Sequence, residues 1–412
     1  MKDSPKWLIF ISAACFAGFT AAAFATTDNW RFGFLFLISG LFGFVIKYGK
    51  FGFTCTFREM LSQGAMKQMR DLIMFLFFAT FLCNLVNWCG TKHPLFLLND
   101  STSKFSDSGA PIGLSLVIGS FIFGIGMNIG SGCASGTLVG MGEGFLKSWE
   151  VIWFFIAGAT IGSTDPCYNW WSKLPKFSKT TYVPAWANLF ILVGLYFLTL
   201  IFDYFKNLYI SHHLMQSTIE LKDVRGLMTQ EVQPIEPLYK RLINQVILGF
   251  FLALPIGLFY LCTGGMIGVM GTFAKIGANF LKIFGVHPSE WDFFIKNPLP
   301  KSMMYDHIFL SDIFIILGAF VAASIAKNFG TSQKKGLFEY LIGILGGLLM
   351  GFGARMAGGC NIGTMLSGIT SNSMNGYVWM VCAIIGNAVP IYIKKIYDKH
   401  HEKSISGYIP VN

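Results

Sequence analysis

One glycine-rich motif occurs twice in the sequence, and each copy carries a cysteine. The first copy, Gly119–Thr137, reads GSFIFGIGMNIGSGCASGT, and the second, Gly346–Thr364, reads GGLLMGFGARMAGGCNIGT. At a constant separation of 227 residues, five glycines, the cysteine and the final threonine coincide. This register indicates an internal duplication in which Cys133 and Cys360 are equivalent positions.

Composition places the duplication in a membrane protein. The chain has 412 residues, of which 53% are hydrophobic and only 13% charged, whereas soluble domains carry about 25% charged residues. Several apolar segments approach the roughly 20 residues that a membrane-spanning helix needs. They are Trp7–Ala25, Asp71–Trp88, Ala187–Phe205, Leu242–Cys262, Phe309–Ala326 and Trp379–Ile393. The sequence therefore predicts an all-α polytopic membrane protein.

The net charge of +10 comes from Lys and Arg clusters that separate the apolar segments. No single basic face is formed, so nucleic-acid binding is not expected. Placing the clusters in the cytoplasm predicts about ten spans and both termini in the cytoplasm. We expect a first transmembrane half at 1–206, a cytoplasmic linker at 207–241, a second half at 242–398 and a cytoplasmic tail at 399–412.

In this topology the two motifs run in opposite directions across the membrane. That arrangement predicts two inverted-topology repeats, whose substrate site lies between the halves near the midplane. Glycines flank each cysteine on both sides, which favours an interrupted helix. We therefore expect broken or re-entrant half-helices that meet at a central pore.

Each motif offers polar groups beside its cysteine. The backbone N–H groups at the start of a second half-helix favour an anion. Ser131, Ser135, Thr137, Asn361 and Thr364 add hydroxyl or amide groups at the same place. The alternative is that the glycines form packing faces and the cysteines are small buried apolar residues.

Thiols narrow the chemistry further. A buried thiol stays neutral and is a weak hydrogen-bond donor that can contact a soft, polarizable atom. A phosphate or sulfate site is expected to rely on Arg, Lys and hydroxyl groups instead. The residues thus indicate a small anion that contains sulfur or selenium. The nine cysteines lack the spacing of a zinc site or a disulfide scaffold, and no metal or cofactor is expected.

Two charged residues near the motifs have open interpretations. Arg355, five residues before Cys360, is either an electrostatic attractor for the anion or a structural residue bonded to loop carbonyls. Glu143 is either an ion-pair partner at a gate or a surface residue. Cys89 and Cys167 both fall near the outer face, where a disulfide between them is conceivable.

The pattern GxGxxxxxGCxxG, present twice, resembles the YeeE/YedE family of membrane proteins, which includes thiosulfate transporters. The stretch GGMIGVMGTFAKIGANFLKIFGVHPSEW also resembles that family. The resemblance implies an hourglass of two inverted halves in which thiols pass the ion along. It implies Cys133 and Cys360 at the constriction, Cys55 as a third pathway thiol and Cys262 as a weaker candidate.

The leading hypothesis is a transporter of the bacterial inner membrane, not an enzyme, that takes up a thiosulfate-like anion across the lipid bilayer. The length of the chain is closer to the YedE-type members, some of which are associated with selenium metabolism. A first alternative is therefore transport of a selenite- or selenide-like species. A second is a membrane-embedded sulfur-transfer protein that forms a persulfide. A cytoplasmic sulfur or selenium carrier protein is a further expected partner.

Overall fold

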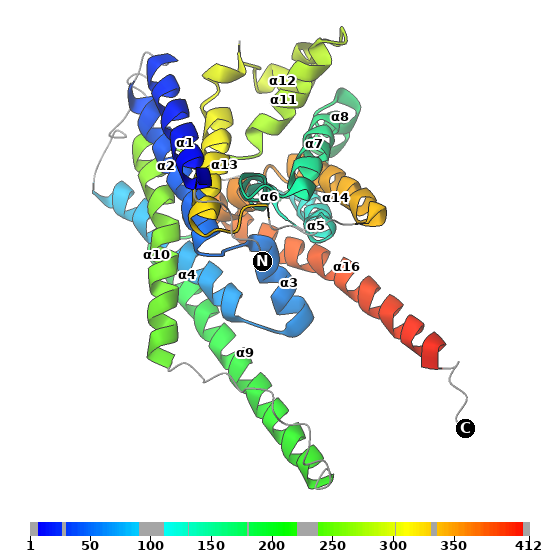
Figure 1. Ribbon diagram of the computed structural model, residues 1–412. Helices are drawn as coiled ribbons and strands as arrows, with labels where there is room; N and C mark the ends of the chain where they lie inside the picture. The colour runs from blue at the N-terminus through cyan, green and yellow to red at the C-terminus, as the bar shows by residue number, and fades with distance from the viewer. Residues whose placement is uncertain are drawn as a thin grey trace.

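The computed structural model describes residues 7–26, 30–89, 111–130, 132–178, 181–220, 238–300, 302–330 and 336–406, and these are almost entirely helical (Figure 1). The first half contains α1 (Trp7–Thr26), α2 (Trp30–Tyr48), α3 (Phe53–Gln63), α4 (Lys67–Trp88), α5 (Leu114–Ile129), α6 (Ala134–Gly142), α7 (Leu146–Ile161), α8 (Asp165–Ser172) and α9 (Ala185–Glu220). The second contains α10 (Leu238–Thr263), α11 (Gly271–Lys282), η1 (Pro288–Glu290), α12 (Asp292–Lys296), η2 (Met303–Tyr305), α13 (His307–Ile325), α14 (Leu337–Met356), η3 (Asn361–Leu366), α15 (Ser367–Thr370) and α16 (Met374–Ser406). Two short strands, β1 (Ile112–Gly113) and β2 (Lys176–Ser178), pair antiparallel.

Eight helical segments of the described residues are long and apolar enough to cross a membrane, and Trp7–Ala22 forms a shorter apolar helix. This makes a polytopic membrane protein. The count is lower than the predicted ten, partly because α7 has 16 residues, fewer than the roughly 20 that a straight crossing needs.

Helices from the two halves of the chain pack against each other in matching pairs. α2 packs on α13, and α4 packs on α10. In the same way α7 packs on α14, α5 packs on α16, and α5 and α14 cross each other. Small residues allow these close approaches: a Cβ atom at Gly119 of α5 would lie 2.5 Å from the backbone nitrogen of Ala357.

Aromatic side chains fill the space around the crossing of α5 and α14. The buried ring of Phe123 on α5 packs at 5.3 Å from Trp379 of α16 and at 6.3 Å from Phe155 of α7. Phe155 in turn meets Phe273 of α11 at 5.0 Å. This edge-to-face and tilted packing, favourable for aromatic rings, holds the elements that carry the two motifs.

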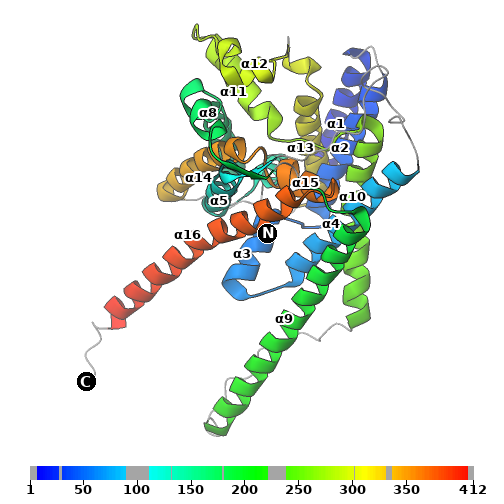
Figure 2. The same cartoon turned by 180° about the vertical axis from the view of Figure 1, so that it is seen from behind.

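The expected linker at 207–241 is partly helical. α9 continues through residues 207–220, and α10 begins at Leu238, whereas residues 221–237 lie outside the described part of the chain. α16 likewise continues to Ser406, within the expected tail. Both long helices project from the same side of the bundle, as seen from the front and from behind (Figures 1 and 2).

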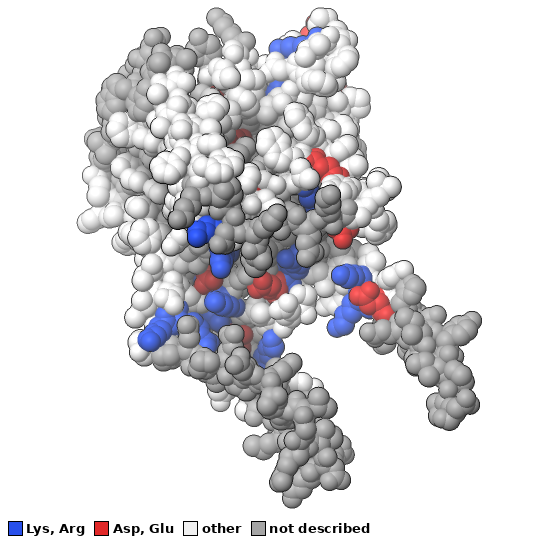
Figure 3. Space-filling model, viewed as in Figure 1, with Lys and Arg blue, Asp and Glu red and all other residues white. Residues whose placement is uncertain are grey.

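Basic side chains gather on that same side. On the face seen in Figure 3, most of the visible Lys and Arg lie in the lower half, around the projecting helices. In the upper half of this face, most of the residues that are not grey are white, that is, uncharged. An excess of Lys and Arg on one side is typical of the cytoplasmic side of a membrane protein.

Candidate functional site

Cys133 lies where the first motif interrupts its helix. α5 ends at Ile129, α6 begins at Ala134, and Cys133 is the N-cap residue of α6 with extended backbone. The backbone N–H of Gly136 donates to its sulfur at 3.4 Å, and Ser135 Oγ lies 3.3 Å from the same sulfur. Thr137 Oγ1 donates to the Cys133 carbonyl at 2.8 Å. The thiol, 2% exposed, is thus held at the start of a half-helix.

Cys360 occupies the equivalent break in the second motif. α14 ends at Met356, and Cys360 precedes η3, which is a π-helical turn. Turns of this kind occur frequently at functional sites. Gly358 has a φ of +79°, a conformation that favours glycine. The thiol of Cys360 is 1% exposed.

The polar residues after Cys360 differ in how they are bonded. Thr364 Oγ1 lies 3.4 Å from the Ala357 carbonyl, to which it donates. Asn361 is fully buried, yet neither its amide nitrogen nor its amide oxygen has a hydrogen-bond partner. Buried amides are normally bonded, so Asn361 presents free donors and an acceptor beside the thiol.

Three of the four predicted thiols lie near one another. Cys133 is within electrostatic range of both Cys360 and Cys55. Cys262, near the end of α10, is buried and has no such interaction with these three described thiols. Cys89 and Cys167 are free cysteines, so the structure contains no disulfide between them. Ser131, also predicted for the site, lies outside the described residues.

Cys55 differs from the two motif cysteines because it is more exposed and has a cationic side chain beside it. It lies in the amphipathic helix α3 and is half-buried. Arg58 Nη2 approaches its sulfur to 3.8 Å from the next turn. The sequence analysis missed Arg58, although the spacing of three residues on a helix places both side chains on one face.

Arg355 of α14 is half-buried, with its Nε and Nη2 atoms shielded from solvent, and its guanidinium lies 4.4 Å above the ring of Phe293 in α12. Its side chain also packs close to Gly162, just after α7. Its Nε and Nη2 atoms have no hydrogen-bond partner, so the loop-carbonyl interpretation is not satisfied at these two atoms. A buried cation with free donors is a suitable group to attract an anion.

Glu143 is a buried ion-pair partner. It caps the end of α6, and its carboxylate lies 2.7 Å from Lys47 Nζ of α2. A second pair, Lys275 of α11 with Asp306 at the start of α13, spans 2.6 Å. These pairs neutralise charges near the two ends of α13, because α13 packs on both α2 and α6.

Buried polar atoms without a hydrogen-bond partner recur on the elements around the motifs. Thr54 of α3, Thr272 of α11, and Ser311 and Asp312 of α13 are all buried and unpaired. The sequence analysis did not single out Asp312. Its signal was a single carboxylate within the apolar segment Phe309–Ala326, since intramembrane acids are commonly functional.

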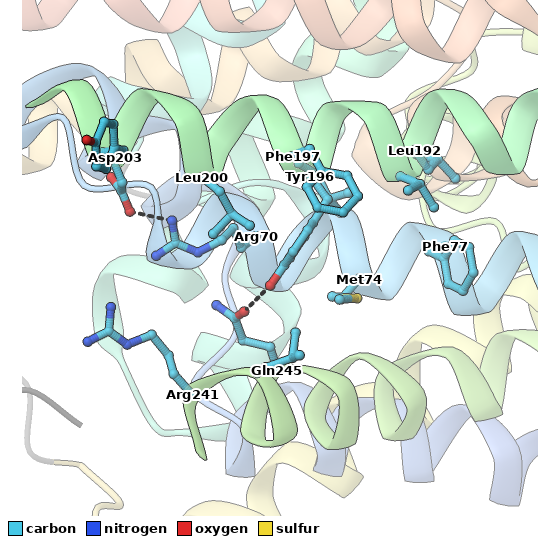
Figure 4. Close-up of a pocket in the computed structure, with 14 residues that line it drawn as sticks. Arg70, Met74, Phe77, Leu192, Tyr196, Phe197, Leu200, Asp203, Arg241 and Gln245 are labelled. Atoms are coloured by element: carbon cyan, nitrogen blue, oxygen red, sulfur yellow. Dashed lines mark hydrogen bonds and ion pairs between the residues drawn. The ribbon is translucent and has the colours of Figure 1, made fainter. Parts of the chain in front are cut away.

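A separate cavity of about 520 Å³ lies between α4, α9 and α10 (Figure 4). Its walls are mostly apolar, and its polar end holds an ion pair between Arg70 and Asp203. Tyr196 donates to the Gln245 amide oxygen at 3.0 Å beside it. None of the described thiols lines this cavity, which is therefore distinct from the cysteine site.

The sequence of the chain is similar to those of known transporters. The sequence model of a family described as sulphur transport matches residues 48–389. The chain is 27% identical over 367 residues to the thiosulfate transporter TsuA of Spirochaeta thermophila, a match that covers 85% of this chain and 95% of that protein. It is 25% identical over 363 residues to the thiosulfate transporter TsuA of Escherichia coli, covering 85% and 91%.

A shorter match involves the probable transporter YedE of Escherichia coli. It is 31% identical over 125 residues and covers 30% of this chain and 31% of that protein. The family match, by contrast, spans most of the sequence, including both cysteine motifs. The chain therefore belongs to the sulphur transport family, the YeeE/YedE family of membrane proteins.

Proposed function

We propose that this protein takes up a small sulfur-containing anion, of the thiosulfate type, through a pathway that Cys133, Cys360 and Cys55 line. The observation that carries the proposal is the position of the two motif thiols. Each is buried at the break between two helical segments, and the two lie within electrostatic range of each other. Buried residues from the two halves of the chain thus lie near each other.

The surrounding groups suit a passing anion better than a tightly held one. Neutral thiols donate weak hydrogen bonds, and conduction requires binding that is weak enough for release. Asn361, Thr54 and Thr272 contribute unpaired donors, while Ser135 and Thr137 hold Cys133 in place. Arg355 supplies a buried positive charge that attracts the anion before it reaches the thiols. We give Cys262 a lesser role, at the margin of the pathway.

The packing of the helices supports an inverted repeat with halves at 1–206 and 242–398. If α2, α4, α5 and α7 correspond to α10, α13, α14 and α16, then exchanging the halves turns each principal contact into another one. The contact of α2 with α13 becomes that of α10 with α4, and the contact of α7 with α14 becomes that of α16 with α5. This exchange is the behaviour of a two-fold axis.

We assign the protein to the bacterial inner membrane with both termini and the 207–241 linker in the cytoplasm. The gathering of basic side chains around the projecting ends of α9 and α16 (Figure 3) supports this orientation. A membrane-impermeant label that reacts with a tag at residues 221–237 in intact cells would contradict it.

Uptake of radiolabelled thiosulfate into proteoliposomes tests the function. Wild-type protein is expected to accumulate the label, while Cys133→Ala and Cys360→Ala each reduce the initial rate at least tenfold. Cys83→Ala is the matched control, because Cys83 is equally buried but lies in α4. Normal uptake by both motif variants would rule out the thiol pathway.

The same preparation separates transport from sulfur transfer. Mass spectrometry after exposure to thiosulfate is expected to find unmodified Cys133 and Cys360. A persulfide on either residue would favour a sulfur-transfer protein instead. Competition by selenite in the uptake assay measures whether the pathway also admits selenium anions.

A further inference from the structure

Asp312 is an acid without a hydrogen-bond partner near the start of an apolar helix. It lies in the second turn of α13, and it is 4% exposed. Neither carboxyl oxygen has a hydrogen-bond partner. Its neighbour Ser311 is also buried and unpaired, so no local hydroxyl group compensates for the burial of the acid.

The part of α13 that carries Asp312 lies beside the start of α11 and the end of α6. Residues four apart lie on one face of a helix, so Asp312 shares its face with Ile308 and Ile316. The Ile308 side chain lies 3.5 Å from the Cβ position of Gly271, where α11 begins. The Ile316 carbonyl meets Gly142 at the end of α6. Asp312, between these two contacts, is also within electrostatic range of Cys360.

Two of the cations near α13 are already engaged by other acids. Lys275 of α11 is paired with Asp306, and Lys47 of α2 is paired with Glu143. Among the described side chains, the titratable or charged groups on the elements packed against α13 are Cys15 of α1, Lys47 and Tyr48 of α2, Cys133 and Glu143 flanking α6, and Lys275 and Lys282 of α11, with Asp306 at the N-cap of α13 and His307 in its first turn.

The charged group that interacts electrostatically with Asp312 is Asp306, and both are acids. An ionised carboxylate at Asp312 would therefore be buried without a counter-charge, which is strongly unfavourable in a medium of low dielectric constant. When no anion is bound, Asp312 is therefore expected to be a neutral carboxylic acid. An acid of this kind is the usual residue of proton relays in transporters.

We propose that Asp312 binds a proton that crosses the membrane together with the anion. This inference rests on the proposed function. A protonated Asp312 donates a hydrogen bond to the anion near Cys360, whereas an ionised Asp312 repels it. The anion and the proton therefore occupy the site together. The proton is bound by a carboxyl oxygen from the outer side and released to the cytoplasm, and no bond to sulfur forms or breaks.

Proteoliposomes that contain a trapped pH-sensitive dye test the coupling. With wild-type protein, external thiosulfate is expected to acidify the lumen, and an acidic external medium is expected to raise the initial uptake rate severalfold. Asp312→Asn removes the proton site but keeps a polar group of similar size. It is expected to abolish the acidification and the stimulation by the pH gradient. Ser311→Ala, at the adjacent buried and unpaired residue, is the matched control and is expected to retain both.

The possible outcomes test proton coupling separately from anion transport. Thiosulfate uptake by wild-type protein without acidification would overturn proton coupling and leave anion transport intact. Absence of thiosulfate uptake would instead overturn the proposed function. Acidification that persists in Asp312→Asn would overturn the assignment to Asp312.

A chemical probe replaces the variant if Asp312→Asn does not fold. Dicyclohexylcarbodiimide is apolar and reacts with protonated carboxyl groups in membranes. Wild-type protein is expected to be labelled at Asp312, as located by mass spectrometry, and to lose acidification in proportion to the labelling. Full labelling of Asp312 with unchanged acidification, or loss of acidification with Asp312 unlabelled, would overturn the assignment.

Discussion

A Cβ atom at Gly119 would lie 2.7 Å from the carbonyl oxygen of Gly353, and a Cβ atom at Gly353 would lie 2.7 Å from the carbonyl oxygen of Gly119. The same reciprocal contact joins Gly126 and Gly346, at 2.8 and 3.0 Å. The duplicated motif equates Gly119 with Gly346 and Gly126 with Gly353. The glycines of the repeat are thus the points at which α5 and α14 cross.

Adding a methyl group at this crossing is expected to destabilise the protein. Gly119→Ala and Gly353→Ala each force the two backbones apart, at a cost of about 1–3 kcal/mol, and should lower the melting temperature in detergent. Gly194→Ala in α9 is the control, because no atom lies within 4 Å of its Cβ position. Equal melting temperatures for all three variants would mean that the crossing tolerates separation.

Breaking the Lys47–Glu143 pair is expected to destabilise the end of α6. Glu143→Gln leaves the Lys47 ammonium largely buried without its carboxylate, and loss of one partner of a buried pair costs about 3–5 kcal/mol. The double variant Lys47→Met/Glu143→Gln removes the unpaired cation and is expected to regain much of that loss. Thermal unfolding followed by size-exclusion chromatography measures both. A double variant less stable than Glu143→Gln alone would contradict this account.

Arg355 is expected to act on anion affinity more than on the maximal rate. Arg355→Met removes the buried charge and should raise the KM for thiosulfate uptake roughly tenfold, which corresponds to about 1.4 kcal/mol. Arg355→Lys keeps the charge but loses the planar group above Phe293, so an intermediate KM is expected. Phe293→Leu keeps the guanidinium and serves as the control for packing. An unchanged KM in Arg355→Met would assign the residue to structure alone.

Cys55 is expected to react faster with a water-soluble thiol reagent than either motif cysteine. It is half-buried, whereas Cys133 and Cys360 are buried, so a reagent dissolved in water reaches its sulfur more readily. Methanethiosulfonate modification, with each site followed by mass spectrometry, measures the three rates. Faster modification of Cys360 than of Cys55 would place the exposed end of the pathway elsewhere.

Much of the candidate cysteine site could be predicted from the local sequence. Glycines on both sides of Cys133 and Cys360 predicted that each helix would be interrupted there, and α5 and α14 do end just before these residues. The polar neighbours Ser135, Asn361 and Thr364 follow for the same reason, because they are within a few residues of a thiol. What such local patterns omit is bonding: Thr364 is bonded to a carbonyl, while Asn361 is not.

The sequence by itself determined that the protein is a helical membrane protein with two equivalent glycine-cysteine motifs, because composition, apolar length and glycine spacing act locally along the chain. The tertiary structure decided which distant groups meet. It pairs Glu143 with Lys47, places Arg355 over Phe293 and brings Asp312 within range of Cys360. Those relationships depend on how helices far apart in sequence pack, and the free energy of that packing belongs to the whole bundle and not to any single segment.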